Sequence, residues 1–199
     1  MMSKAEKTKE FIIEQSAPLF NCKGYAGTSL TDLIKATGLT KGAIYGNFEN
    51  KDEVALAVYK HNIKFINQKL DASIAGKDSA TEQLVAFTQF YRLNWKKLFE
   101  KGGCPVLNAA IEADDNLPFL KPAVQESIKK WAKKIRTILD AGKQRGEFKE
   151  HINTEEYAYA FIVLIEGGIM LSKILNNPQF LFSSLDRILS ITNTELKNN

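Results

Sequence analysis

The chain has 199 residues, of which 44% are hydrophobic and 25% are charged, and its formal net charge is +4. This composition is ordinary for a soluble globular protein of one ample domain or two small ones, and the lack of repeats or low-complexity tracts excludes solenoids and disordered linkers. The first ten residues, MMSKAEKTKE, are charged from Lys4 onward and do not resemble a signal peptide, so we expect a cytoplasmic protein.

Apolar residues recur at three- and four-residue spacing in almost every segment between turn signals, which predicts an all-α protein of about nine helices. Thr28 or Ser29, then Thr40 and Asn50, are the expected N-caps of successive helices. The helices are expected over residues 4–21, 29–38, 40–48, 51–74, 78–100, 105–113, 118–147, 154–176 and 178–196. We expect an N-terminal unit over residues 1–50, a connecting helix over 51–74, and a larger helical bundle over 75–199.

The segment TKGAIYGNFENK, residues 40–51, reads as a short helix with two glycines one turn apart. Each glycine costs about 0.8–1.0 kcal/mol relative to alanine inside a helix. On a helical projection, Ile44 and Phe48 share the inner face, while Gly42 and Gly46 fall on the opposite side. A helix face without side chains, as at Gly42 and Gly46, permits either close packing in the protein interior or close approach of an external molecule. The polar residues around it favour the external molecule: Lys41, Asn47 and Glu49.

A tight turn at Gly38 separates this helix from the preceding one, and Leu30 and Leu39 are placed to pack the pair together, which is helix-turn-helix spacing. In such a unit the second helix enters the major groove of DNA while the first crosses the backbone. We therefore expect a double-stranded DNA operator as partner, with Lys41 as the leading candidate for base contact. The predicted DNA-binding residues are Thr28, Ser29, Thr40, Lys41, Gly42, Ala43, Tyr45, Gly46, Asn47 and Lys51. Phosphate contacts are expected from Thr28, Tyr45, Asn47 and Lys51, and base-edge contacts from Thr40, Lys41 and the backbone of Gly42 and Ala43.

Residues 24–59, GYAGTSLTDLIKATGLTKGAIYGNFENKDEVALAVY, resemble the N-terminal DNA-binding domain of tetracycline-repressor-type (TetR family) transcriptional regulators. The resemblance rests on the order of a glycine turn, Thr-Ser, an apolar helix, Gly-apolar-Thr-Lys-Gly, aromatic-x-polar-Phe and Lys-x-Glu. Gly46 departs from this pattern, because a larger side chain is common there, and the departure leaves sequence preference at that point open. The resemblance implies that the remaining helices form a ligand pocket and a homodimer interface.

Two apolar stripes with aromatic members lie in the C-terminal half, over residues 84–98 and 124–138. Aromatic stripes at helical spacing are usually core, but a pocket between bundle helices with aromatic walls and a few polar groups is also where small ligands bind. Some residues of one stripe can belong to the core while others line a ligand pocket. The candidate pocket for an apolar or amphipathic effector comprises Phe87, Tyr91, Trp95, Cys104, Asn108, Trp131 and Phe161.

The last two predicted helices carry the homodimer hypothesis. Gly167 and Gly168 lie inside an apolar helix and permit close helix approach, and Leu181, Leu185 and Ile188 give the next helix an apolar face. The two helices form either an internal pair within one monomer or a dimer interface. A dimer is favoured because a two-fold operator needs two recognition helices about 34–36 Å apart.

Catalytic, metal-binding and membrane functions find no support in the sequence. His61 and His151 have no Ser, Cys or Asp near them in triad or metal-ligand spacing, so we expect no enzyme, no catalytic residue and no cofactor. Cys22 and Cys104 lack paired Cys or His spacing, so we expect no metal site and two reduced thiols. The apolar run 161–175 is interrupted by charges and falls short of the roughly 20 residues of a membrane span, so we expect a buried helix.

The predicted function is a dimeric, ligand-responsive transcriptional repressor that binds a pseudo-palindromic operator. One alternative is a regulator controlled by a protein partner or by its own concentration, and another is a non-specific architectural DNA-binding protein. The operator, the effector, the regulated genes and the choice between repression and activation stay open at this level.

Overall fold

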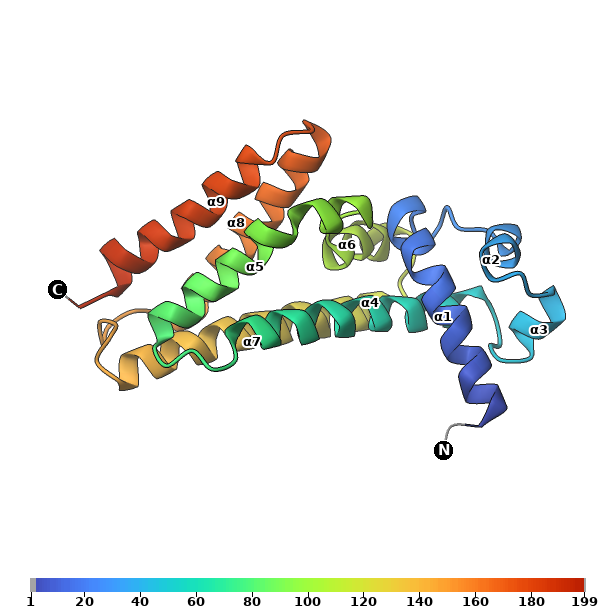
Figure 1. Ribbon diagram of the computed structural model, residues 1–199, viewed down its shortest axis with the longest axis horizontal. Helices are drawn as coiled ribbons and strands as arrows, with labels where there is room; N and C mark the ends of the chain where they lie inside the picture. Colours follow the sequence, from blue (N-terminus) through green and yellow to red (C-terminus); the bar gives the residue numbers. More distant parts are fainter. Residues whose placement is uncertain (1–2, 199) are drawn as a thin grey trace. The chain divides into compact units, whose positions relative to one another are not determined.

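All regular elements of residues 3–198, the part of the chain that this computed structural model describes, are helices (Figure 1). They are α1 (Lys4–Lys23), α2 (Leu30–Thr37), α3 (Lys41–Tyr45), α4 (Lys51–Ile74), α5 (Ala80–Glu100), α6 (Pro105–Asp115), α7 (Lys121–Gln144), α8 (Thr154–Ile174) and α9 (Gln179–Ile191), followed by a π-helical turn (Thr192–Leu196). The all-α prediction is confirmed, and α4 begins and ends at the predicted residues. The third helix is shorter than predicted because the chain leaves it at Gly46.

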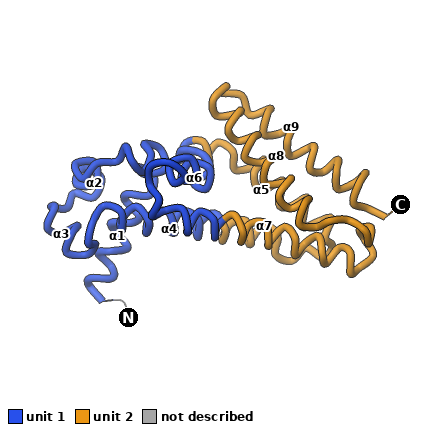
Figure 2. Tube along the Cα trace, turned by 180° about the vertical axis from the view of Figure 1, so that it is seen from behind, with its two compact units in different colours: residues 1–66, 100–127 blue, residues 67–99, 128–199 orange. Residues whose placement is uncertain are grey.

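The chain packs into two compact units, which Figure 2 shows in different colours. One unit holds residues 1–66 and 100–127, and the other holds residues 67–99 and 128–199. The sequence predicted a single boundary after residue 74 instead. The difference arises because α6 bonds to the end of α1: Asn108 Nδ2 donates to the carbonyl oxygen and to Oδ1 of Asn21, at 3.1 Å each. The unit that contains the helix-turn-helix therefore includes α6.

The helices of the first unit begin and end where side chains or glycine satisfy the local backbone. Ser3 and Glu6 form a capping box at the start of α1, and Ser29 and Asp32 form another at the start of α2. Gly38 ends α2 in the left-handed conformation, with φ 69°, which glycine adopts without a steric penalty. Gly38 thereby allows the tight turn that separates α2 from α3.

The core of the first unit joins α1 to the helix-turn-helix. Ile12 and Phe20 of α1, Leu33 of α2, Ile44 of α3 and Val58 of α4 are all 0% exposed. Burying a side chain of this size stabilises the fold by about 1.5–3 kcal/mol. The short helices α2 and α3 depend on this packing, because isolated helices of fewer than about 12–15 residues are marginal in water.

In the second unit, α5 begins against the loop that follows α7. The Glu147 carboxylate accepts hydrogen bonds from the backbone N–H groups of Ala80 and Thr81, at 3.0 and 3.1 Å. Burial acts to raise the pKa of Glu147, but these two donors, together with the Thr81 hydroxyl and the charge of Arg145, outweigh it and hold the pKa below its ordinary value. The carboxylate therefore stays charged at the positive end of α5, where it satisfies two of the free N–H groups.

Helices α8 and α9 run side by side (Figure 1) and approach closely at Gly168. A Cβ atom at Gly168 would lie 3.0 Å from Leu181 Cα and 2.9 Å from Ser184 Oγ. The Ser172 hydroxyl oxygen accepts a hydrogen bond from the Leu181 N–H at 2.8 Å. For Gly168, the close approach that the sequence predicted occurs within one chain.

Within the described residues, α8 is the one helix long and apolar enough to cross a membrane, with a mean hydropathy of 1.5 over its tested window. It spans 21 residues and is therefore longer than the apolar run noted in the sequence. Of that window, 39% is buried inside the chain. Length alone thus does not exclude a span, although core helices of soluble proteins share this length and composition.

Candidate nucleic-acid interface and effector groove

Helix α3 turns its apolar side to the protein and its polar side to solvent. The Thr40 hydroxyl oxygen caps the helix by accepting a hydrogen bond from the Ala43 N–H at 3.2 Å. Ile44 is fully buried and Phe48 is 2% exposed, as the helical projection predicted. Of the predicted contact residues in this segment, Thr40, Lys41, Gly42 and Gly46 are exposed, and Ala43, Tyr45 and Asn47 are half-buried.

Backbone conformation does not require Gly46, and internal packing does not require Gly42. Gly46 has φ −75° and ψ −14°, a right-handed helical conformation open to any residue. A Cβ atom at Gly46 would lie 3.1 Å from the Gly42 carbonyl oxygen, a slightly tight contact. A Cβ atom at Gly42 would have Thr40 Oγ1, 3.9 Å away, as its nearest neighbour. Gly42 therefore exposes bare backbone to solvent without any structural need inside the chain.

The lysines around the helix-turn-helix differ in how far their charge is neutralised. Lys23 forms an ion pair with Asp32. The hydrogen bond from Lys23, together with donors from Ser29, holds the pKa of Asp32 well below its usual range. Lys41 is exposed and makes no ion pair with the described residues. Of these two lysines, Lys41 alone keeps its charge available to an external anion.

Three of the predicted phosphate ligands are bonded within the protein. Thr28 is fully buried and its hydroxyl donates to the Gly24 carbonyl oxygen at 2.6 Å, so the predicted side-chain contact with a phosphate does not fit this structure. Asn47 Nδ2 donates to the Ala43 carbonyl oxygen at 2.9 Å. The Lys51 ammonium lies against backbone carbonyl oxygens of residues 25, 26 and 28. Sequence spacing could not reveal this, because Lys51 and its partners come from segments more than 20 positions apart.

The seven residues predicted for an effector pocket are mostly used for packing. Phe87 and Phe161 are 0% exposed, and the Tyr91 ring stacks on Trp131 with 6.4 Å between centroids. The Trp95 ring packs edge-on against Phe99 and Phe182. Cys104 and Asn108 lie in the other unit, where Cys104 is the N-cap of α6 and Asn108 bonds to Asn21. Packing inside the protein, the alternative to a ligand pocket, therefore accounts for the positions of these predicted residues.

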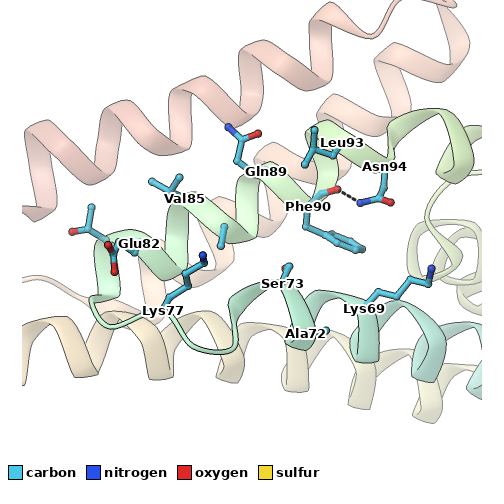
Figure 3. Close-up of a pocket in the computed structure, with 12 residues that line it drawn as sticks. Lys69, Ala72, Ser73, Lys77, Glu82, Val85, Gln89, Phe90, Leu93 and Asn94 are labelled. Atoms are coloured by element: carbon cyan, nitrogen blue, oxygen red, sulfur yellow. Dashed lines mark hydrogen bonds between the residues drawn. The ribbon is translucent and has the colours of Figure 1, made fainter.

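A groove of about 650 Å³ lies between α4 and α5, and none of the seven predicted residues lines it. In Figure 3 the Phe90 ring extends from α5 toward α4, where Ser73 and Lys69 lie. The α5 side also includes Val85 and Leu93, which are 39% and 79% exposed. The remaining lining residues are Ala72, Lys77, Thr81, Glu82, Ala86, Gln89 and Asn94. Apolar residues of α5 that fall outside its core stripe are the sequence feature that could have indicated this groove.

Helix α8 carries an apolar stripe that faces solvent. Val163, Met170 and Ile174 are 70%, 48% and 79% exposed, and their spacing of seven and four residues places them on one face. A Cβ atom at Gly167, on the same helix, would meet nothing within 4 Å. Large apolar side chains grouped on one exposed helix face are typical of an interaction site.

Comparison with known proteins agrees with these features over both halves of the chain. Residues 12–58 match the family described as "Bacterial regulatory proteins, tetR family", and residues 80–186 match "Tetracyclin repressor-like, C-terminal domain". An uncharacterised HTH-type transcriptional regulator encoded in the lacX 3′ region of Lactococcus lactis subsp. lactis is 31% identical in an alignment of 188 residues that covers 90% of this chain and 90% of its own. The HTH-type transcriptional regulator LmrA of Bacillus subtilis is 28% identical over 85% of this chain and 88% of its own.

A TetR-family transcriptional regulator of solved structure, from Cytophaga hutchinsonii, superposes with a TM-score of 0.95 at 38% identity, over 100% of this chain and 99% of that chain. These relatives are regulators of transcription and not enzymes. The chain belongs to the TetR family of bacterial helix-turn-helix transcriptional regulators.

Proposed function

We propose that the protein is a homodimeric transcriptional repressor that binds a pseudo-palindromic operator through α3 and is released by a small apolar or amphipathic effector. The observation that carries the DNA-binding part is the exposed side of α3. There, Gly42 leaves bare backbone that nothing in the chain requires, next to the unpaired charge of Lys41. The wall of the DNA major groove can approach such a surface closely, and the Lys41 side chain can reach base edges.

The operator can be identified by selection from a library of random-sequence duplexes. The proposal expects the enriched duplexes to contain two inverted half-sites centred about one helical turn, or a multiple of it, apart. Recovery of no sequence preference after repeated rounds would contradict it.

Lys41→Ala is expected to relax base preference at one position in each half-site. A direct contact with a base edge contributes about 1–3 kcal/mol of discrimination against the wrong base, and the substitution removes it. The measurement is the affinity for the selected duplex and for duplexes changed at single positions. Lys35→Ala, which removes an exposed lysine of α2, is the matched control and should lower all these affinities alike.

Gly42→Ala is expected to raise the free energy of unfolding by up to about 1 kcal/mol, because alanine favours the helix and its Cβ meets open space. The same methyl group is expected to weaken binding to the selected duplex about tenfold, since it would separate α3 from the floor of the groove. Equal affinity of this variant and the wild type would show that the bare backbone does not face DNA.

The exposed apolar stripe of α8 supports homodimerisation. Val163 and Ile174 would leave water if a second copy of the chain packed its own stripe against them. Such an isologous interface makes a two-fold dimer, which matches the symmetry of a palindromic operator.

The α4–α5 groove supports an effector site, because its volume of about 650 Å³ lies within the roughly 300–1,000 Å³ of ligand pockets. Apolar walls with lysine and amide groups at the edge suit an amphipathic molecule. The continuous helix α4, which begins beside the helix-turn-helix, offers a route to the DNA-binding helices. Shifting a population from 1:99 to 99:1 requires a differential affinity of about 5.5 kcal/mol between the two states.

A gel shift on the selected duplex tests this part of the proposal. Addition of a small-molecule extract of the source cells should release the wild type, whereas Ala86→Trp, which fills the groove, should stay bound. The second candidate, control by a protein partner or by concentration, is favoured instead if the extract releases nothing and a protein fraction does.

A further inference from the structure

The turn between α1 and α2, residues 24–28, is held by a carboxylate from α6. Glu112 Oε1 accepts a hydrogen bond from the Tyr25 N–H at 2.8 Å, and Oε2 accepts one from the Ala26 N–H at 2.7 Å. Both oxygens of one side chain thus bind consecutive backbone amides, more than 80 positions away in the sequence. Hydrogen bonds to an ionised acceptor are roughly twice as strong as neutral ones.

Gly24 makes room for this carboxylate. Its φ of 89° lies in the region that favours glycine, and a Cβ atom there would come within 3.0 Å of Glu112 Oε1. The turn is therefore shaped to receive the Glu112 side chain.

Lys51, at the start of α4, holds the carbonyl groups of the same turn. Its ammonium donates to the carbonyl oxygens of Tyr25, Ala26 and Thr28, at 3.3, 3.4 and 3.0 Å. Tyr25 and Ala26 therefore donate their N–H groups to an anion while their carbonyl groups accept from a cation. The carboxylate at the N–H groups and the ammonium at the carbonyl groups polarise the peptide groups of the turn in the same direction. Each hydrogen bond therefore strengthens the others.

The turn determines where α2 starts. The Thr28 hydroxyl closes it on the Gly24 carbonyl oxygen, and Ser29 directly follows as the N-cap of α2. Helix α3 follows α2 after the single turn at Gly38. A change in the turn therefore changes the placement of both helices of the helix-turn-helix.

Helix α6 is itself anchored to the end of α1, so it can serve as a fixed support. Asn108 Nδ2 donates to Asn21 and also to the Gly102 carbonyl oxygen at 2.9 Å. In the other direction, Asn21 Nδ2 donates to the Gly103 carbonyl oxygen at 3.1 Å. Glu112 projects one helical turn beyond Asn108, toward residues 24–28.

We propose that Glu112 and Lys51 are positioning residues for DNA binding, which hold the turn 24–28 from opposite sides and so place α2 and α3 for the operator. This inference rests on the proposed function, because it concerns the same DNA-binding surface. It replaces the direct phosphate contact that the sequence predicted for Lys51 with a role inside the protein.

The test compares Glu112→Gln and Glu112→Ala with Asp114→Asn. Asp114 lies on the same helix, where it pairs with Lys121 at the surface, and its side chain is 72% exposed. The two readouts are backbone amide exchange of Tyr25 and Ala26, without DNA, and affinity for the duplex selected by the wild type, at a temperature where circular dichroism shows each variant folded.

Protection of both amides is expected to decrease in the order wild type, Glu112→Gln, Glu112→Ala, and operator affinity should fall about tenfold for Glu112→Gln. That fall follows because apparent affinity scales with the fraction of protein in the competent geometry. Asp114→Asn should bind as tightly as the wild type or slightly more tightly, since it also removes a negative charge. A Glu112→Gln variant that matches Asp114→Asn in both readouts would overturn the proposal.

Lys51→Met separates the two roles considered for this lysine. Positioning predicts weaker binding to the selected duplex with an unchanged dependence on salt. A phosphate contact predicts weaker binding to every sequence and a salt slope reduced by about one unit, and that result would overturn the role assigned to Lys51. If the duplex selection yields no preferred sequence while the amide protection changes as expected, the proposed function is contradicted. The role of Glu112 in holding the turn 24–28 is then still supported.

Discussion

A variant that carries Val163→Glu and Ile174→Glu is expected to be monomeric and to lose most of its preference for the selected operator over random DNA. Both side chains are largely exposed in the single chain, at 70% and 79%, so the substitutions should leave the monomer fold intact. In a two-fold interface formed by this stripe the glutamates of the two copies would be buried together, and uncompensated buried charge is strongly unfavourable. A monomer contacts one half-site and makes half of the base contacts, so most of the advantage of specific over non-specific binding, roughly 10³–10⁷ for a complete site, should be lost.

Light scattering coupled to size exclusion measures the oligomeric state, and a gel shift on the selected duplex measures binding. Ile111→Glu is the matched control, because Ile111 is an apolar residue of α6, 65% exposed, and is not part of the exposed stripe of α8. This control should stay dimeric and keep its affinity. A double variant that remains dimeric would place the interface elsewhere on the chain.

Gly142→Ala is expected to lower the free energy of unfolding by roughly 1–3 kcal/mol or more, as overpacked cores do. A Cβ atom at Gly142 of α7 would lie 2.2 Å from Phe148 Cδ2 and 2.9 Å from Ala80 Cβ. The Phe148 ring cannot retreat easily, because it is 1% exposed and its backbone N–H donates to the Gly142 carbonyl oxygen at 3.2 Å. The loop that follows α7 should therefore be displaced.

Denaturant unfolding at fixed protein concentration measures this effect, with Gly42→Ala as the comparison. The same change of residue is expected to destabilise at position 142 and to stabilise at position 42, because a Cβ atom at Gly42 has only Thr40 Oγ1 near it, at 3.9 Å. Stabilisation at both positions would mean that helix propensity, and not packing around the glycine, decides stability at position 142. Destabilisation at both would contradict the open surroundings assigned to Gly42.

Local signals predicted the helices well, because their causes lie within a few residues. Ser29, one of the two predicted caps of the second helix, begins α2, Thr40 caps α3 as predicted, and Gly38 ends α2. The inner face of α3 was also predictable, since the positions of Ile44 and Phe48 follow from helical geometry alone.

Contacts between distant segments were not predictable in this way. Neither the hydrogen bonds that Glu112 accepts from the turn 24–28 nor the carbonyl partners of Lys51 follow from spacing, and the Glu112 bonds add to the contacts that join α6 to the first unit. The aromatic stripe of α5 predicted a pocket around Tyr91, but that side faces the core and the groove lies along Phe90. Helical periodicity shows which residues share a face of a helix, but it does not show what that face contacts.

The most direct test of the account is the affinity of the wild-type protein for the selected duplex and for a random duplex of equal length, measured over a range of salt concentrations. Sequence-specific recognition by α3 predicts that the selected duplex binds at least about 10³-fold more tightly at physiological salt. Equal affinities with the same salt dependence would contradict operator recognition and identify a non-specific DNA-binding protein.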